Sequence, residues 1–496
     1  MAEQQVRRQR RSRRATLLLA YAALAMERAD AALLPAVYRE IGAALQASPT
    51  ALGSIALSRS VVQTACYPLA AYLAARHDRV TVIALGAFVW AAATFLIGFS
   101  TTFPQMAITA ALNGVGLALQ IPAIYAFVAD SVDGASRGMA FGWLAVAGKA
   151  GTVAGTSLGL LMAPTSLLGL PGWRLAFILL GVLGAAVGVS IRAFATTDAA
   201  RGRAVPVTTS AAVNAKPVRQ ELREFAGESR AVMRIPSFQV IIAQGLTGSF
   251  PWSALLFTAM WLELVGFSHS ETAALMTLFK LATSLGALFG GKMGDALARR
   301  FRNSGRIVLS QISSGSAIPL AGVLLLALPN DASSTVKHGA ALFILGIMAS
   351  WNGTATNSPI LAEIVPPRAM TTVFALDRTF EAVLASFAPP VVGMLAERLY
   401  GYKLVRSVAT GAGVDERAAV DVQMERHNAT SLARAIYTCV AVPMALCCAI
   451  YSFLYCTYPR DRDMARAEAA RDRGSHGGEE SDSEDEGDGE RKLLPK

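Results

Sequence analysis

The chain has 496 residues, of which 53% are hydrophobic and 16% are charged, and its formal net charge is +10. Soluble domains carry about 25% charged residues, so this composition excludes a soluble enzyme domain and indicates an integral membrane protein. The positive charge does not predict nucleic-acid binding, because no basic domain accompanies the arginine-rich start of the chain.

Twelve apolar segments, each long enough to cross a bilayer as a helix, can be drawn in chain order. Six precede a polar break and six follow it. Their approximate ranges are 16–38, 51–74, 80–98, 104–129, 138–163, 174–195, 238–264, 271–293, 306–328, 339–364, 370–397 and 433–456. This pattern predicts an all-α membrane protein with a basic N-terminal segment (1–15), a six-helix bundle (16–195), a linker (196–237), a second six-helix bundle (238–456) and an acidic tail (457–496).

The polar segments indicate how the chain is oriented. Most lysines and arginines fall in one set of alternating loops and tails, and this asymmetry predicts that both termini are cytosolic. On the opposite side, the long loop 398–432 contains the sequon Asn428-Ala429-Thr430, a predicted glycosylation site. The membrane itself, plasma membrane or endomembrane, is left open.

The linker and the tail have different patterns. Apolar residues from Val218 to Val232 recur at helical spacing with charged residues on the other faces, which predicts an amphipathic helix at the membrane surface. The acidic run from Glu479 to Glu490 is rich in serine and glycine, a composition typical of disorder.

The first span carries three ionisable residues, Glu27, Arg28 and Asp30, near its middle. Charged side chains at that depth are costly and are usually kept for a site, a relay or an ion pair. A rise of about 1.5 Å per residue places Arg59 of the second span level with Asp30, so these two are predicted to pair. Arg28 could instead pair with either acid.

A second set of charges lies on the eleventh span, where Asp377 and Glu381 share one helix face with Arg378 beside them. The same depth count places Lys280 of the eighth span and Lys149 of the fifth span level with Glu381. Acids and bases are therefore predicted to meet near the midplane. They could exchange protons and partners during a transport cycle, or form a fixed network that holds helices together.

Two loops echo each other in the two halves. The segment after the eighth span reads GKMGDALARR, and the segment after the second span reads AYLAARHDRV. They resemble the loops between helices 2–3 and 8–9 of the major facilitator superfamily, G-x-L-A-D-R-x-G-R-K. The later copy keeps Gly291, Asp295, Arg299 and Arg300, whereas the earlier copy has Ala75 at the acid position. The glycine-rich fourth span, GVGLALQIPAIYAFVADS, also resembles that family, in the manner of its plant and algal members and, more loosely, of spinster-like lysolipid transporters.

The resemblance implies two pseudo-symmetric six-helix bundles, with spans 1, 4, 7 and 10 lining a cavity and spans 2, 5, 8 and 11 forming the contact between bundles. It also implies that Asp295 meets the start of the fifth span near Arg137. Residues for substrate and proton binding would be Glu27, Arg28, Asp30, Arg59, Asn113, Gln120, Gln244, Trp252, Trp351 and Asn357. Residues for gating would be Lys149, Lys280, Gly291, Asp295, Arg299, Arg300, Asp377, Arg378 and Glu381. The polar cavity residues could equally bond one helix to another.

Neither an HExxH motif nor a P-loop occurs, so we expect no enzyme activity, no metal, no cofactor and no nucleotide-driven pumping. The prediction is a secondary transporter of a small organic solute, anionic or zwitterionic, which alternates its access, is coupled to protons and acts as a monomer in the bilayer. A lysolipid or sphingolipid transporter is one alternative. A transport-inactive membrane sensor or scaffold is another.

Overall fold

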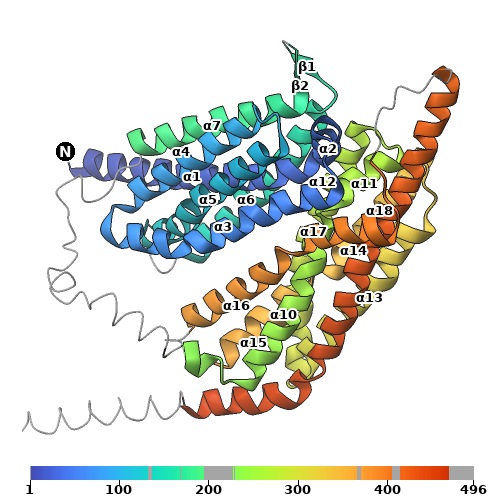
Figure 1. Ribbon diagram of the computed structural model, residues 1–496. Helices are drawn as coiled ribbons and strands as arrows, with labels where there is room; N and C mark the ends of the chain where they lie inside the picture. Colours follow the sequence, from blue (N-terminus) through green and yellow to red (C-terminus); the bar gives the residue numbers. More distant parts are fainter. Residues whose placement is uncertain are drawn as a thin grey trace, which may run out of the picture.

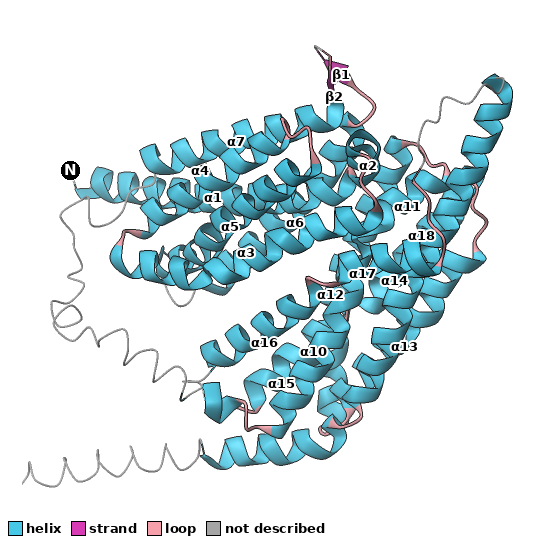
Figure 2. Ribbon diagram, viewed as in Figure 1, coloured by secondary structure: helices cyan, strands magenta, loops and turns pink. Residues whose placement is uncertain are grey.

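The computed structural model describes residues 2–131, 137–167, 169–194, 227, 229–365, 370–404 and 414–468. These residues are almost entirely helical (Figure 2). The strands they include are the two short ones of a hairpin, β1 (Ser166–Leu167) and β2 (Leu170–Pro171), which pair antiparallel.

The first half of the chain forms one bundle, drawn in blue to green in Figure 1. In chain order its helices are α1 (Ala2–Ala36), α2 (Tyr38–Leu45), α3 (Pro49–Arg76), α4 (Arg79–Ile97), α5 (Phe103–Ser131), α6 (Arg137–Met162) and α7 (Gly172–Phe194). The basic segment that was predicted as a separate tail continues α1. Ser48 caps the start of α3, where its side chain accepts a hydrogen bond from the Ala51 amide.

The second half forms the other bundle, and several of its spans are interrupted. Pro251 precedes a 3₁₀ turn between α10 and α11, and π-helical turns interrupt or end three further spans. The helices are α10 (Pro236–Ala254), α11 (Thr258–Val265), α12 (His269–Arg300), α13 (Gly305–Gly322), α14 (Thr335–Ala349), α15 (Ser358–Glu363), α16 (Met370–Ala385), α17 (Ala388–Met394) and α18 (Val414–Tyr451).

These helices match the twelve-span prediction. Among the described residues, nine helical stretches are long and apolar enough to cross a membrane. Three helical spans remain. They are α1, which carries Glu27, Arg28 and Asp30 within its apolar stretch, α3, and the broken pair α14 and α15. The chain is therefore an all-α, multi-pass membrane protein built of two bundles.

The start of the last span differs from the prediction, and two other predicted segments lie mostly or entirely outside the described residues. Helix α18 begins at Val414, so much of the predicted loop 398–432 is helical and extends the last span. The predicted amphipathic helix of the linker lies outside the described residues except at 227 and 229–232, and the acidic run 479–490 lies outside them entirely.

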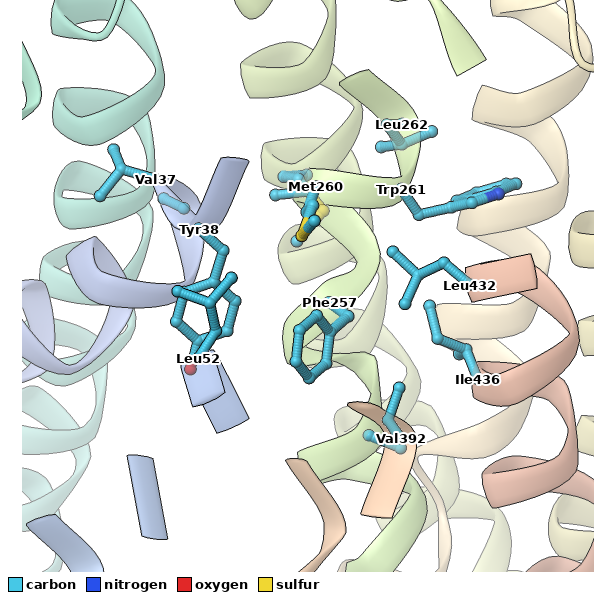
Figure 3. Close-up of a cluster of buried hydrophobic side chains, with 14 of the residues drawn as sticks. Val37, Tyr38, Leu52, Phe257, Met260, Trp261, Leu262, Val392, Leu432 and Ile436 are labelled. Carbon is cyan, nitrogen blue, oxygen red and sulfur yellow. The ribbon is translucent and has the colours of Figure 1, made fainter. Parts of the chain in front are cut away.

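The two bundles meet at one end and diverge toward the other (Figure 1). We call the meeting end the closed face and the other end, where α3 and α12 finish, the open face. At the closed face an apolar plug joins the halves (Figure 3). The rings of Tyr38 and Phe257 lie 5.1 Å apart there, beside Leu52 and Val392. The amide of Thr50 also donates to Glu397 Oε1 at 2.7 Å.

Glycines allow backbone to touch backbone at two kinds of contact. Between the halves, a Cβ on Gly53 would lie 2.4 Å from the carbonyl carbon of Pro389, and one on Gly393 would lie 2.3 Å from the Thr50 nitrogen. Within the first bundle, a Cβ on Gly155 of α6 would lie 2.0 Å from the Ala29 carbonyl oxygen of α1. Small residues at such crossings let membrane helices pack closely.

We expect Gly155→Val to destabilise the first bundle by about 1–3 kcal/mol or more, because the larger side chain must separate α1 from α6. Gly142→Val in the same helix is the matched control, since a Cβ there would meet nothing within 4 Å. Thermal unfolding of the purified protein in detergent measures both. Equal melting temperatures for the two variants would contradict this account of α1–α6 packing.

Candidate functional site

Asp30 lies at the centre of a buried polar network in the first bundle. Its Oδ1 accepts from Thr94 Oγ1 at 2.7 Å, and its Oδ2 accepts from Asn113 Nδ2 at 3.0 Å. Arg59 Nη2 lies 3.1 Å from Oδ2, which is the ion pair predicted from depth. The Asp30 side chain is 1% exposed and that of Arg59 is 11% exposed, so this ion pair is almost entirely enclosed.

Glu27 and Arg28 show the same arrangement one turn earlier on α1. Glu27 Oε2 lies 3.1 Å from Arg28 Nε, although this contact lacks hydrogen-bond geometry. The Glu27 side chain is 3% exposed, whereas that of Arg28 is 41% exposed. The acids predicted to line a crevice are therefore buried behind their arginines.

Basic side chains continue from Arg28 across the junction of the bundles. The carbon chain of Arg28 packs near Gly148 of α6, and the next residue, Lys149, is exposed. Helix α6 packs against α12 of the other bundle, where Lys280 lies close enough to Lys149 to interact electrostatically. Arg28, Lys149 and Lys280 form what we call the basic row.

The charges of α16 do not join this row. Arg378 Nη1 pairs with Glu381 Oε2 at 3.0 Å, and Asp377 is buried with its Oδ1 lacking a partner. No ion pair between Lys280 and Glu381 occurs among the described residues, so the predicted meeting of acids and bases across spans 8 and 11 is wrong for this conformation. Glu381 instead packs on Gly245 of α10 and pairs with Arg378 of its own helix.

A cleft of about 260 Å³ separates α3 from α10, α16 and α17. Ser60, Gln63 and Tyr67 line it from the first half, and Ser253 and Ser386 line it from the second. This cleft lies at the seam between the bundles, and sequence reasoning named none of these residues. Small hydroxyl residues on apolar spans carry no signal that separates a cleft wall from a helix contact.

The six polar and aromatic residues predicted to face the cavity divide unequally. Trp252 is exposed and stacks on Phe279. The amide of Gln244 donates to the Ile241 carbonyl within its own helix, and Asn357 accepts from the Tyr451 hydroxyl. Asn113, Gln120, Gln244, Trp351 and Asn357 are all buried. Asn113 and Asn357 bond to other helices, as the alternative predicted, whereas the Gln120 amide and the Trp351 indole nitrogen have no hydrogen-bond partner among the described residues.

The loop segment Gly291 to Arg300 lies at the open face, on the last turns of α12. Asp295 Oδ1 pairs with Arg306 Nη2 at 2.9 Å, and Arg306 also donates to the Ala355 carbonyl. The predicted partner near Arg137 has side chains outside the described residues. Asp295 and Arg299 line a cavity of about 460 Å³ together with Glu363, Arg462 and Arg466.

Asn428, the asparagine of the predicted sequon, is buried and hydrogen-bonded in the structure. Its side chain is buried within α18, its Oδ1 accepts from the Lys403 amide, and its Nδ2 donates to the Lys403 carbonyl at 2.8 Å. Asn428 therefore ties a loop to the last helix, and its glycosylation stays a prediction.

Polar residues at the closed face join the bundles and were missed from sequence. Arg39 of α2 forms an ion pair with Glu425 of α18 and donates to the Glu263 carbonyl. Burial, and then the negative charge of Glu263, raise the pKa of Glu40 to about 7. The signal was available in the polar residues that follow the first span, but their partners lie more than 200 residues away.

The buried pair of α1 and α3 provides a test. Asp30→Ala should destabilise the protein by about 3–5 kcal/mol, because Arg59 is left uncompensated. The double variant Asp30→Leu/Arg59→Met should recover part of this loss. Thermal unfolding in detergent measures the stability of the four proteins of this double-mutant cycle. Arg378→Met is the control, since the Arg378 side chain is 67% exposed and exposed ion pairs contribute about 0–1 kcal/mol. Additive effects of the two single changes would show that the pair is not coupled.

Comparisons with known proteins agree with this geometry. The chain is 26% identical over 378 residues to an MFS-type efflux pump of Mycolicibacterium smegmatis, covering 74% of this chain and 80% of the pump. Its fold is similar to an inward-facing, unoccupied structure of a bacterial homologue of the human lysosomal transporter Spinster. That match has a TM-score of 0.74 at 18% identity and covers 91% and 98% of the two chains. A D-xylose–proton symporter matches with a TM-score of 0.56 at 13% identity, covering 85% and 96%.

The family model of the Major Facilitator Superfamily matches residues 17–403, which include every helix of the first bundle and most of the second. Gly155-Thr156-Ser157-Leu158-Gly159 has the spacing of a hydrolase G-x-S-x-G, but it lies inside α6 and not on the strand-to-helix turn that such a nucleophile requires. The two bundles, their helices and this match lead to one conclusion: the chain belongs to the Major Facilitator Superfamily and is a multi-pass membrane transporter, not an enzyme.

Proposed function

We propose that this transporter moves a small organic solute with a negatively charged group, by alternating access and with coupling to protons. The basic row of Arg28, Lys149 and Lys280 is the observation that carries the proposal. Like charges gathered near a membrane midplane are costly unless an anion compensates them. No ion pair joins Lys149 or Lys280 to an acid among the described residues. A carboxylate or phosphate of the substrate would supply that charge.

The arrangement of the bundles supports alternating access. The halves are sealed by the apolar plug at the closed face and diverge at the open face (Figures 1 and 3). The charge asymmetry of the sequence assigns the open face and both termini to the cytosol. This conformation would then receive or release substrate on the cytosolic side, and rocking of the bundles would expose the basic row to the other side.

Proton coupling would follow from competition for Arg28. A buried carboxylate is stabilised in its charged form by an adjacent guanidinium and in its neutral form by the loss of that partner. If the anionic group of the substrate draws Arg28 away, Glu27 loses its only ion-pair partner among the described residues and takes up a proton. Substrate and proton would therefore bind together, which corresponds to symport.

Uptake into proteoliposomes tests the proposal. A panel of monocarboxylates, dicarboxylates, amino acids, phosphate esters and neutral sugars is measured with and without a pH gradient. We expect anionic or zwitterionic compounds to accumulate only with the gradient. Glu27→Gln should keep counterflow exchange but lose accumulation driven by the gradient, while the exposed control Asp331→Asn should keep both. Accumulation by Glu27→Gln at the unmodified level would refute coupling through this residue.

The basic row makes a separate prediction about affinity. Lys280→Gln should raise the KM for an anionic substrate at least about tenfold, because one charge-assisted contact is lost. Lys280→Arg keeps the charge and should largely restore uptake. Initial rates of uptake measure both variants, and an unchanged KM in Lys280→Gln would remove this residue from the binding site.

A lysolipid or sphingoid lipid is the second candidate substrate. Two observations favour it: the fold similarity to a Spinster homologue, and the cleft at the seam between α3 and α16, through which a lipid could enter sideways. Vesicles that contain a fluorescent lysophospholipid or sphingoid phosphate add this class to the panel. Transfer of the lipid without uptake of any soluble anion would favour this candidate. A transporter should keep its flux when residues 474–496 are deleted. Absence of flux for every compound, together with a cellular effect that is lost on this deletion, would favour a transport-inactive sensor or scaffold instead.

A further inference from the structure

Three ionisable side chains converge at the closed face, away from the basic row. Glu40 lies on α2, Glu263 on α11 and His269 at the start of α12. Glu263 Oε1 is 2.7 Å from His269 Nδ1, and Glu40 Oε1 is 3.8 Å from the same nitrogen. One oxygen or nitrogen from each residue lies within 4.8 Å of the other two. The first bundle supplies one of these side chains and the second bundle supplies two.

The cluster has acceptor atoms that the described residues do not use. The Glu263 side chain is only 1% exposed, and its Oε2 has no hydrogen-bond partner. Glu40 Oε2 is likewise buried without a partner. Arg39 does not neutralise these carboxylates directly, since it pairs with Glu425 and donates to the Glu263 backbone carbonyl. Two buried carboxylates beside one imidazole leave negative charge that either a proton or a bound cation would compensate.

We propose that Glu40, Glu263 and His269 form a binding site for a divalent transition-metal cation of the Zn²⁺ type. One imidazole nitrogen and two carboxylate oxygens are ligands that Zn²⁺ accepts, and water completes the fourth position. Mg²⁺ and Ca²⁺ prefer oxygen ligands alone, so the histidine selects against them. Ligand atoms bound at about 2.0–2.2 Å lie at most about 4.4 Å apart, which the three side chains reach by a small rotation toward the cation.

The site ties the two bundles together, because Glu40 and the other two ligands belong to different halves. All three can hold one cation only while the closed face is closed. A cation that binds this form alone shifts the equilibrium toward it by about 100-fold when its concentration is 100 times its Kd. The bound cation would therefore stabilise the closed conformation of this face and slow its opening. It would not be the transported solute, because the basic row proposed for the solute lies away from this cluster.

Titration of the full-length, untagged protein with ZnCl₂ tests the site. Calorimetry should find one Zn²⁺ per chain, with no competition from a large excess of MgCl₂. Glu263→Gln and His269→Ala should each weaken this binding at least about tenfold. His77→Ala is the matched control, since this exposed histidine ends α3 at the open face and should leave the binding unchanged.

Two further measurements separate loss of the site from loss of the fold. His269→Cys should retain Zn²⁺ binding, because a thiolate is also a zinc ligand, and with CoCl₂ it should gain a thiolate-to-metal absorption band. Addition of ZnCl₂ to the unmodified protein should slow hydrogen exchange in residues 38–45. The proposal is overturned if no Zn²⁺ binds, if binding persists unchanged in Glu263→Gln and His269→Ala, or if folded His269→Cys binds neither metal.

Discussion

The structure depends on how it shelters charge inside a layer of hydrocarbon. Asp30 is stabilised by three partners from three other helices, α3, α4 and α5, so one carboxylate fixes the relative positions of four helices in the first bundle. Removal of Arg59 would leave the buried Asp30 charge without compensation, which is far more costly than the loss of an apolar contact. The network therefore holds these four helices in one arrangement, and in the transport mechanism proposed here the exposed Arg28 would meet the solute.

The second bundle solves the same problem differently. Arg378 and Glu381 of α16 pair at short sequence distance. Polar residues of α10, of the π-helical turn η6 (Gly353–Asn357) and of α18 bond across helices. Interrupted helices at η6 and near Pro251 leave backbone groups that such residues can satisfy. The two halves share an architecture without sharing the placement of charge. The basic row shows this asymmetry, because two of its members belong to the first bundle and one belongs to the second.

Much of the fold could be predicted from sequence, because a membrane restricts spanning segments to regular helices whose length and depth can be counted. Counting residues along α1 and α3 identified the Asp30–Arg59 pair. Counting fails for direction around the helix axis, so Gln244 and Asn357 were placed toward the cavity although both are buried between helices. It also fails for contacts at helix ends: Asp295 meets Arg306 eleven residues later, and Arg39 meets Glu425 across the whole chain. Those partners are chosen by the packing of the bundles, which no single span encodes.

The glycine contacts at the closed face have a mechanical consequence. At Gly53 and Gly393 the two bundles touch main chain to main chain, and the Glu397 side chain accepts a hydrogen bond from the Thr50 amide beside this contact. Because glycine has no side chain at these positions, the bundles can reorient here without moving a side chain past the facing backbone. The apolar plug next to this contact would then set most of the free-energy barrier to reorientation. The main-chain contact would act as the pivot for the two bundles, and the aromatic and aliphatic side chains around it would determine the lifetime of each conformation.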